Sequence, residues 1–185
     1  MSSLRFNLLL SFLLIVQFFV FSGKFLIADD NILKSRNIVV TPYRNFLNKL
    51  WNANNFLAMN KCDFSKSKKE PKVKLNINKW IISELNSVSK LIEKNINDYR
   101  FDEAARNIYQ FVWHSYCDWY LELSKTILYS RNKKSIKEIR EVSSYIFKEV
   151  LILMHPFIPF ITEEIWLKNK LDKSNKNYLM HSNWI

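Results

Sequence analysis

Apolar side chains recur every three or four positions along much of the chain, which is the spacing of one face of an α-helix. The pattern is clearest over residues 77–98, where it predicts a helix with a single apolar stripe. The stripe consists of Trp80, Ile81, Leu85, Val88, Leu91, Ile92 and Ile96. We expect this stripe to face the core of the protein.

The same reasoning predicts most of the remaining elements. Three further helices are expected, over residues 43–60, 102–129 and 135–154. Pro42 would occupy the first turn of the earliest of these, and Pro156 would stop the last. Thr162 is expected to cap a short final helix. The chain is therefore predicted to be all-α, with antiparallel helices that form a bundle.

The N-terminus does not fit this pattern. Phe6 to Gly23 is an uncharged and strongly apolar run between Arg5 and Lys24. We therefore divide the chain into an apolar N-terminal segment, residues 1–30, and a helical bundle, residues 31–185. The segment is either a distorted inter-domain helix or a membrane or signal segment at the short end of the spanning range. In the second case the protein would be membrane-associated through residues 6–23.

Composition narrows the possible chemistry. A single glycine, Gly23, excludes a Gly-rich phosphate loop and a dinucleotide-binding fingerprint. The net charge of +11 suits a polyanionic partner, although a lysine-rich and asparagine-rich composition can also arise from AT-rich coding. Cys62 and Cys117 are far apart and have no histidine cluster beside them, so we expect no metal and two reduced thiols.

The predicted helix over residues 43–60 has two unlike faces. Its polar face covers an arc of about 100° and carries Asn45, Asn48, Lys49, Asn52 and Phe56. Amides can pair with base edges, lysine can meet a phosphate, and an exposed aromatic ring can stack on an unpaired base. Sequence-specific RNA recognition favours such splayed bases. The alternative is that the amides only solvate the helix while the phenylalanine packs under the following loop.

No convincing active site is evident. His114 lies among aromatic residues and is expected to be a core histidine, with Asp118 one turn later. His155 precedes a proline and is expected to serve the end of a helix. Glu163 and Glu164 are adjacent and point apart, which is poor geometry for acid–base catalysis.

Three stretches together resemble a known family. They are Tyr43–Asn60, Tyr99–Lys125 and Leu153–Trp166, and they contain the strings NKLWNA, FVWHSYCDWYLE and HPFIPFITEEIW. In this order and spacing they resemble the anticodon-binding domain of valyl-tRNA synthetase, from about residue 31 to residue 185. The resemblance implies a tRNA partner, namely the valine isoacceptor, and a cytoplasmic location.

The resemblance also bears on individual residues. The family segment that faces the anticodon resembles the helix from Arg44 to Phe56, which implies that Lys49, Asn52 and Phe56 are the main tRNA contacts, with Asn45 and Asn48 next. Other matching aromatic positions are interpreted as core. They are Trp113, Trp119, Tyr120 and Trp166.

A synthetase of this family activates valine with ATP and transfers it to tRNA. Neither signature of its ATP-binding domain is present in this sequence, so we expect a fragment without the catalytic and editing domains. The resemblance also implies a C-terminal truncation, because the coiled-coil arm of the family would start beyond Ile185. The chain itself would then use no cofactor, although the parent enzyme uses ATP, and its second partner would be the catalytic domain of the same enzyme. Two alternatives remain: a membrane-anchored helical protein, and a non-functional remnant of a synthetase gene.

Overall fold

The computed structural model describes residues 30–64, 70–169 and 178–182, with side chains from residue 44 onward. The described elements are helical: α2 (Asp30–Met59), α3 (Asn76–Asn97), α4 (Phe101–Gln110), η2 (Phe111–Leu121), α5 (Glu122–Leu128), α6 (Lys133–Met154), α7 (Pro159–Lys168) and η3 (Leu179–His181). The predicted all-α class is confirmed. The apolar run from Phe6 to Gly23 lies outside the described residues. Among those that are described, no helix has the length and apolarity to cross a membrane.

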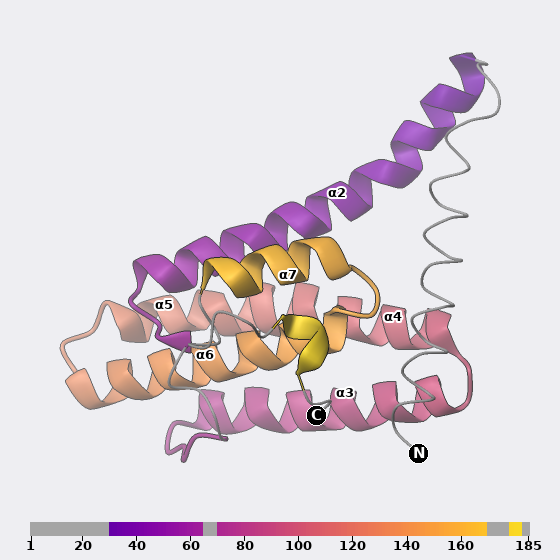
Figure 1. Cartoon of the computed structure of the whole chain (residues 1–185). Coiled ribbons are helices and arrows are strands. Elements are labelled where there is room, and N and C mark those ends of the chain that lie inside the picture. The colour runs from indigo at the N-terminus through magenta and orange to yellow at the C-terminus, as the bar shows by residue number, and fades with distance from the viewer. Residues whose placement is uncertain (1–29, 65–69, 170–177, 183–185) are drawn as a thin grey trace. The chain divides into compact units, whose positions relative to one another are not determined.

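The chain divides into two units, Met1–Leu47 and Asn48–Ile185. In the second unit α3 runs antiparallel to the continuous rod formed by α4, η2 and α5, and α6 turns back along that rod (Figure 1). Helix α6 packs against α3, α4, α5 and α7, so it is the central helix. Its buried side chains include Ile139, Val142, Ile146, Phe147, Val150, Leu151 and Leu153.

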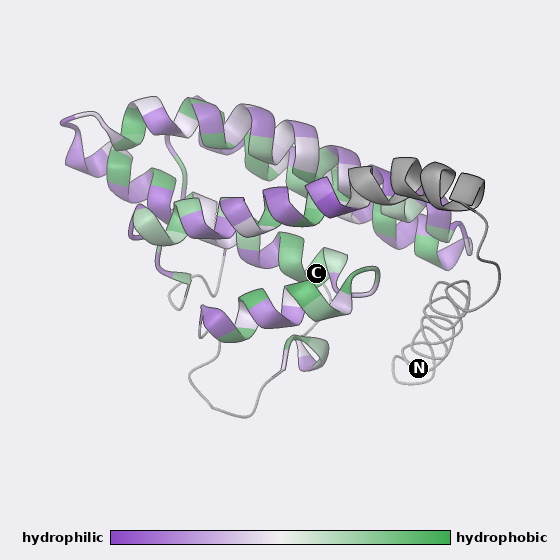
Figure 2. Cartoon of the chain, turned by 90° about the horizontal axis from the view of Figure 1, so that it is seen from above, coloured by the Kyte–Doolittle hydropathy of each residue, from purple (hydrophilic) through white to green (hydrophobic). Residues whose placement is uncertain are grey.

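The C-terminal part of α2 is fixed to the bundle by its apolar side and by polar contacts with α7. Leu50, Ala53 and Leu57 are buried on this side, which follows the helical spacing. The buried amide of Asn54 accepts a hydrogen bond of 2.6 Å from Asn169, just after α7. Apolar and polar residues alternate around the helices in Figure 2, as expected for amphipathic helices. The opposite, polar side of α2 is thereby turned away from the core.

Helix boundaries differ from the prediction at three places. Helix α2 begins at Asp30, so Pro42 lies inside it instead of in its first turn. The single helix expected over residues 102–129 contains a π-helical stretch, η2. The prediction that Thr162 caps the last helix is wrong, because α7 begins at Pro159. Proline suits the first turn because it has no N–H to satisfy, and the Thr162 hydroxyl instead donates to the carbonyl of Ile158.

The apolar stripe of α3 is only partly the core. Trp80 and Leu91, which lie at one edge of the stripe, are exposed. The buried arc is shifted toward the other edge and includes Ile82 and two amides, Asn78 and Asn95. The shift arises because α3 packs against both the α4–η2 rod and α6.

The aromatic residues of the rod also divide in an unexpected way. Tyr120 and Trp166 are buried as predicted, whereas Trp119 is 62% exposed and Trp113 is half-buried. The prediction that Trp119 belongs to the core is therefore wrong. Aromatic residues nearly surround this segment, so the sequence has no stripe that shows which side faces inward. The helical register, which changes at η2, decides it.

The two cysteines are free and buried. Burial raises the pKa of each thiol to about 12, for Cys62 against the opposing effect of Arg140 and for Cys117 against that of Lys49. Because the thiolate is the reactive form, both thiols are expected to be inert.

Candidate nucleic-acid interface

The polar face of α2 remains on the surface in the second unit. Asn48 and Asn52 are exposed, while Lys49 and Phe56 are half-buried. These residues are three or four positions apart, so they lie on the same side of the helix. Asn45 is also exposed, but it belongs to the first unit. The structure thus places four of the five predicted contact residues on one face of the bundle unit.

Lys49 is held against the π-helical segment η2. Its Nζ forms an ion pair of 2.5 Å with Asp118 and lies 3.9 Å from the centre of the Trp113 ring. Tyr109 stacks on the ring of Trp113, with the two ring centroids 5.7 Å apart. Partly exposed ion pairs contribute only about 0–1 kcal/mol, so an incoming phosphate or base acceptor can compete for the ammonium group.

Asp118 has a second neighbour on its own helix. Its other carboxylate oxygen lies 3.5 Å from Nδ1 of His114, whose side chain is 62% exposed. The prediction of a core histidine at position 114 is therefore wrong. The imidazole ring has two polar nitrogen atoms, and the neighbouring carboxylate of Asp118 gives one of them a partner at the surface. π-Helical turns often occur at functional sites, and this one presents His114 and Asp118 beside the polar face of α2.

Phe56 lies near the C-terminal end of the same face. The Nζ of Lys125, from α5, is 5.6 Å from the centre of its ring. Lys125 also pairs with Glu122, at 2.6 and 2.8 Å from the two carboxylate oxygens. Part of the phenylalanine ring stays accessible, with a cation close to it, which is the environment in which an aromatic ring can stack on a base.

Three of these neighbours were not predicted as part of the site. Asp118 and Trp113 of η2, and Lys125 of α5, come from a distant part of the sequence; Lys49 and Asp118 are 69 positions apart. No local pattern could have paired them, because the pairing depends on which side of the rod faces α2. Only the polar face of α2 could be predicted, because the amphipathic pattern of that helix is present in the local sequence.

Other polar groups in the described residues offer no catalytic arrangement. His155 serves the junction of α6 and α7, as predicted: its Nδ1 lies 2.9 Å from the Thr162 hydroxyl. Burial lowers the pKa of His155 despite the opposing effect of Glu163. Within the residues that the structure describes, no three potential metal ligands come together.

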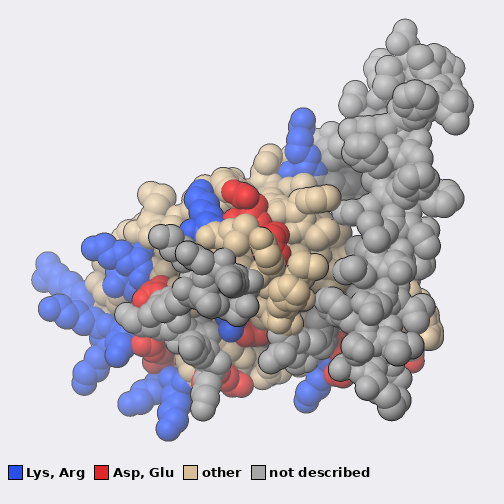
Figure 3. All heavy atoms as spheres, viewed as in Figure 1, with Lys and Arg blue, Asp and Glu red and all other residues tan. Residues whose placement is uncertain are grey.

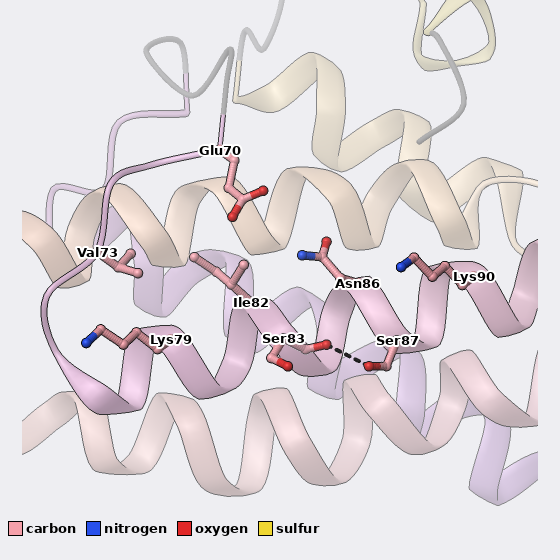
Figure 4. A pocket seen from close by; sticks show the side chains of 8 residues that line it. All are labelled: Glu70, Val73, Lys79, Ile82, Ser83, Asn86, Ser87 and Lys90. Carbon is pink, nitrogen blue, oxygen red and sulfur yellow. Dashed lines mark hydrogen bonds between the residues drawn. The ribbon is translucent and has the colours of Figure 1, made fainter.

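An open groove of about 380 Å³ runs along α3, away from the α2 face. Lys79 and Lys90 lie at its two ends, and Glu70 overhangs it from the preceding loop (Figure 4). Between them Ser87 donates a hydrogen bond of 2.9 Å to the carbonyl of Ser83. The charged side chains along this groove are exposed, and their arrangement suggests no reaction.

The family of the chain is shown by comparison with known domains. Residues 78–185, more than half of the chain, match the anticodon-binding domain of tRNA ligases. The chain therefore belongs to this family of helical domains.

The curated relatives narrow the class. The chain is 66% identical over 145 residues to valine–tRNA ligase of Pelagibacter ubique, a stretch covering 78% of this chain and 17% of that protein. It is 45% identical over 130 residues to the valine–tRNA ligase of Zymomonas mobilis, covering 69% and 15% of the two chains. The corresponding enzyme of Buchnera aphidicola is 45% identical over 130 residues, covering 70% and 14%. The chain thus spans about one sixth of the length of these relatives, and the predicted resemblance to the valyl type is confirmed.

Proposed function

We propose that this chain recognises the anticodon region of a valine tRNA as part of a valine–tRNA ligase. The observation that carries the proposal is its similarity to a section of valine–tRNA ligases within the family of anticodon-binding domains. In the proposal, ATP-dependent activation of valine belongs to the rest of the ligase, the chain itself uses no cofactor, and the catalytic domain is its second partner. A tRNA partner also favours a cytoplasmic location.

The contact surface in this proposal is the polar face of α2. Asn48 and Asn52 have exposed amides that can each donate to and accept from one base edge. Phe56 can stack on an unpaired base, and Lys49 can exchange its intramolecular partner Asp118 for an RNA acceptor. Single-stranded loops present bases in the way that such a face requires.

The proposal is tested by fluorescence anisotropy with the full chain and a labelled hairpin of the anticodon stem-loop of valine tRNA. A second hairpin with the same stem and a permuted anticodon measures discrimination. We expect Asn52→Ala and Phe56→Ala each to weaken binding of the valine hairpin by about 1–3 kcal/mol, which is about five- to 150-fold. Binding of the permuted hairpin should change much less in Asn52→Ala, because an amide reads a base edge, whereas Phe56→Ala should weaken both hairpins, because a ring can stack on any base.

The matched control is Asn86→Ala, which removes an exposed amide from α3, away from the α2 face. It should leave both affinities unchanged. Thermal melting of each variant checks that it still folds, which matters most for Phe56→Ala because Phe56 is half-buried. Equal affinity of the unsubstituted chain for both hairpins, or unchanged discrimination in both variants, would show that this face does not read the anticodon.

A further inference from the structure

Besides the polar α2 face, the bundle has a positively charged surface at one end. We call it the basic end, and it comprises the exposed residues Lys61, Lys72, Lys74, Lys79, Arg131, Lys133, Lys134 and Lys137. They belong to the chain after α2, to the loop and first turn of α3, and to the turn and first turns of α6. Figure 3 shows Lys and Arg side chains gathered at the end where α5 turns into α6.

Contacts between elements bring these segments together. The Oε1 atom of Glu138, on α6, accepts hydrogen bonds of 2.8 Å from the backbone N–H groups of Lys74 and Leu75, so the starts of α3 and α6 are adjacent. Lys125 near the end of α5 lies over Phe56 near the end of α2. The basic end therefore adjoins the C-terminal end of the α2 face.

Few acidic groups balance these cations. The acidic residues described at this end are Asp63, Glu70, Glu138 and Glu141. Glu138 is occupied by backbone N–H groups just before α3, and Glu141 pairs with Lys137 at 3.8 Å. The surface thus keeps a clear positive excess.

The positions of the lysines argue against a role in stability. Lys133 and Lys134 occupy the first turn of α6, and Lys79 the first turn of α3; neither turn contains an acidic residue. The N-terminus of a helix carries a partial positive charge, so lysine is unfavourable there. Cations that gather where they disfavour folding, and that outnumber the acidic residues described around them, are more easily explained by an anionic ligand.

We propose that the basic end binds the phosphate backbone of the anticodon stem of the tRNA. The inference rests on the proposed function: it places the stem beyond the Phe56 end of the α2 face, which is the end that the basic end adjoins. From Asn48 to Phe56 the helix rises about 12 Å, comparable to the span of a few nucleotides. The stem phosphates and the basic end then have complementary charge, and the contact carries no sequence information.

The test compares Lys133→Ala/Lys134→Ala with the control Lys90→Ala/Lys94→Ala. The control removes the same charge from exposed positions of α3, about 16 Å or more along the helix from Lys79 in its first turn. Affinities for the valine and permuted hairpins are measured over a range of salt concentrations. We expect the Lys133/Lys134 variant to reduce the slope of log affinity against log salt by about 1.5–2 and to weaken both hairpins about tenfold, without lowering the melting temperature. The control should change the slope much less.

An unchanged slope in the Lys133/Lys134 variant, or equal reductions in the variant and the control, would overturn the inference. A reduced slope with identical affinities for the two hairpins would retain the basic end as a backbone site while rejecting anticodon recognition by α2. Vesicles containing phosphatidylglycerol provide a further arm. Vesicle binding that the variant loses, with RNA binding unaffected, would assign the basic end to an anionic membrane and overturn the RNA proposal.

Discussion

Replacing Phe147 by alanine is expected to lower the free energy of unfolding by about 3–5 kcal/mol. The side chain is fully buried on the central helix α6, and its ring lies 5.7 Å from that of Phe64 and 6.2 Å from that of Tyr116, measured between centroids. Truncation removes apolar contacts on both sides and leaves a cavity that α6 cannot close, because α3, α4, α5 and α7 surround it. Urea denaturation followed by circular dichroism measures the loss.

The control is Phe160→Ala, which removes the same side chain from α7, where it is 79% exposed. Its effect should stay within about 0.5 kcal/mol. Similar losses in the two variants would contradict the placement of Phe147 in the core. An unsubstituted chain that unfolds without a cooperative transition would instead favour the non-functional remnant considered from the sequence.

The helices that could be predicted well are those whose ends and faces are set locally. The expected helix over residues 77–98 is α3, and the expected end of the fourth helix at Met154 is observed. Pro156 is the reason for the second agreement, since a helix rarely continues through the residue before a proline. Periodicity also identified the apolar side of α2, where Leu50 and Leu57 are buried.

The predictions that were wrong concern features that depend on contacts between segments distant in the sequence. His114 and Trp119 are exposed because the register of η2 turns them away from the core, and no stripe in that aromatic segment indicates it. The partner of Lys49 could not be predicted either, since Asp118 reaches it only after α2 has packed beside η2. The location of the candidate face could thus be predicted, but the ion pair that an RNA ligand must displace could not.

The start of α3 depends on a residue of another helix. Its N-cap position is Leu75, which has no side chain that can accept a hydrogen bond. Glu138 of α6 substitutes for a cap: one of its oxygens accepts from the backbone of Lys74 and Leu75 and, at 2.9 Å, from the buried amide of Asn78. Asn78 in turn accepts a hydrogen bond of 2.9 Å from the Tyr120 hydroxyl, which links this cap to the core.

We therefore expect Glu138→Ala to lower the free energy of unfolding by about 2–3 kcal/mol, because three donors lose a charged acceptor and one of them is buried. Glu141→Ala is the control on the same helix: this glutamate is exposed and makes only the 3.8 Å pair with Lys137, so its loss should be within about 0.5 kcal/mol. Equal losses would show that the cap contributes nothing beyond a surface charge.

The pH dependence of stability distinguishes the effect of the negative charge of Glu138 from that of its hydrogen-bonding side chain. Desolvation alone would raise the pKa of this carboxyl, but the hydrogen bonds from Asn78, Leu75 and Lys74 outweigh it and lower the pKa from 4.5. A lowered folded-state pKa gives stabilisation that is present above the unfolded-state value and is lost as the pH falls through the folded-state value. Glu138→Gln keeps an acceptor oxygen but cannot titrate. The stability difference between the unsubstituted chain and Glu138→Gln, measured by urea denaturation from about pH 7 to about pH 3, should therefore be constant near neutrality and shrink below pH 4.5. A difference that stays constant over the whole range would mean that the ionised form of Glu138 has no special role in holding the start of α3.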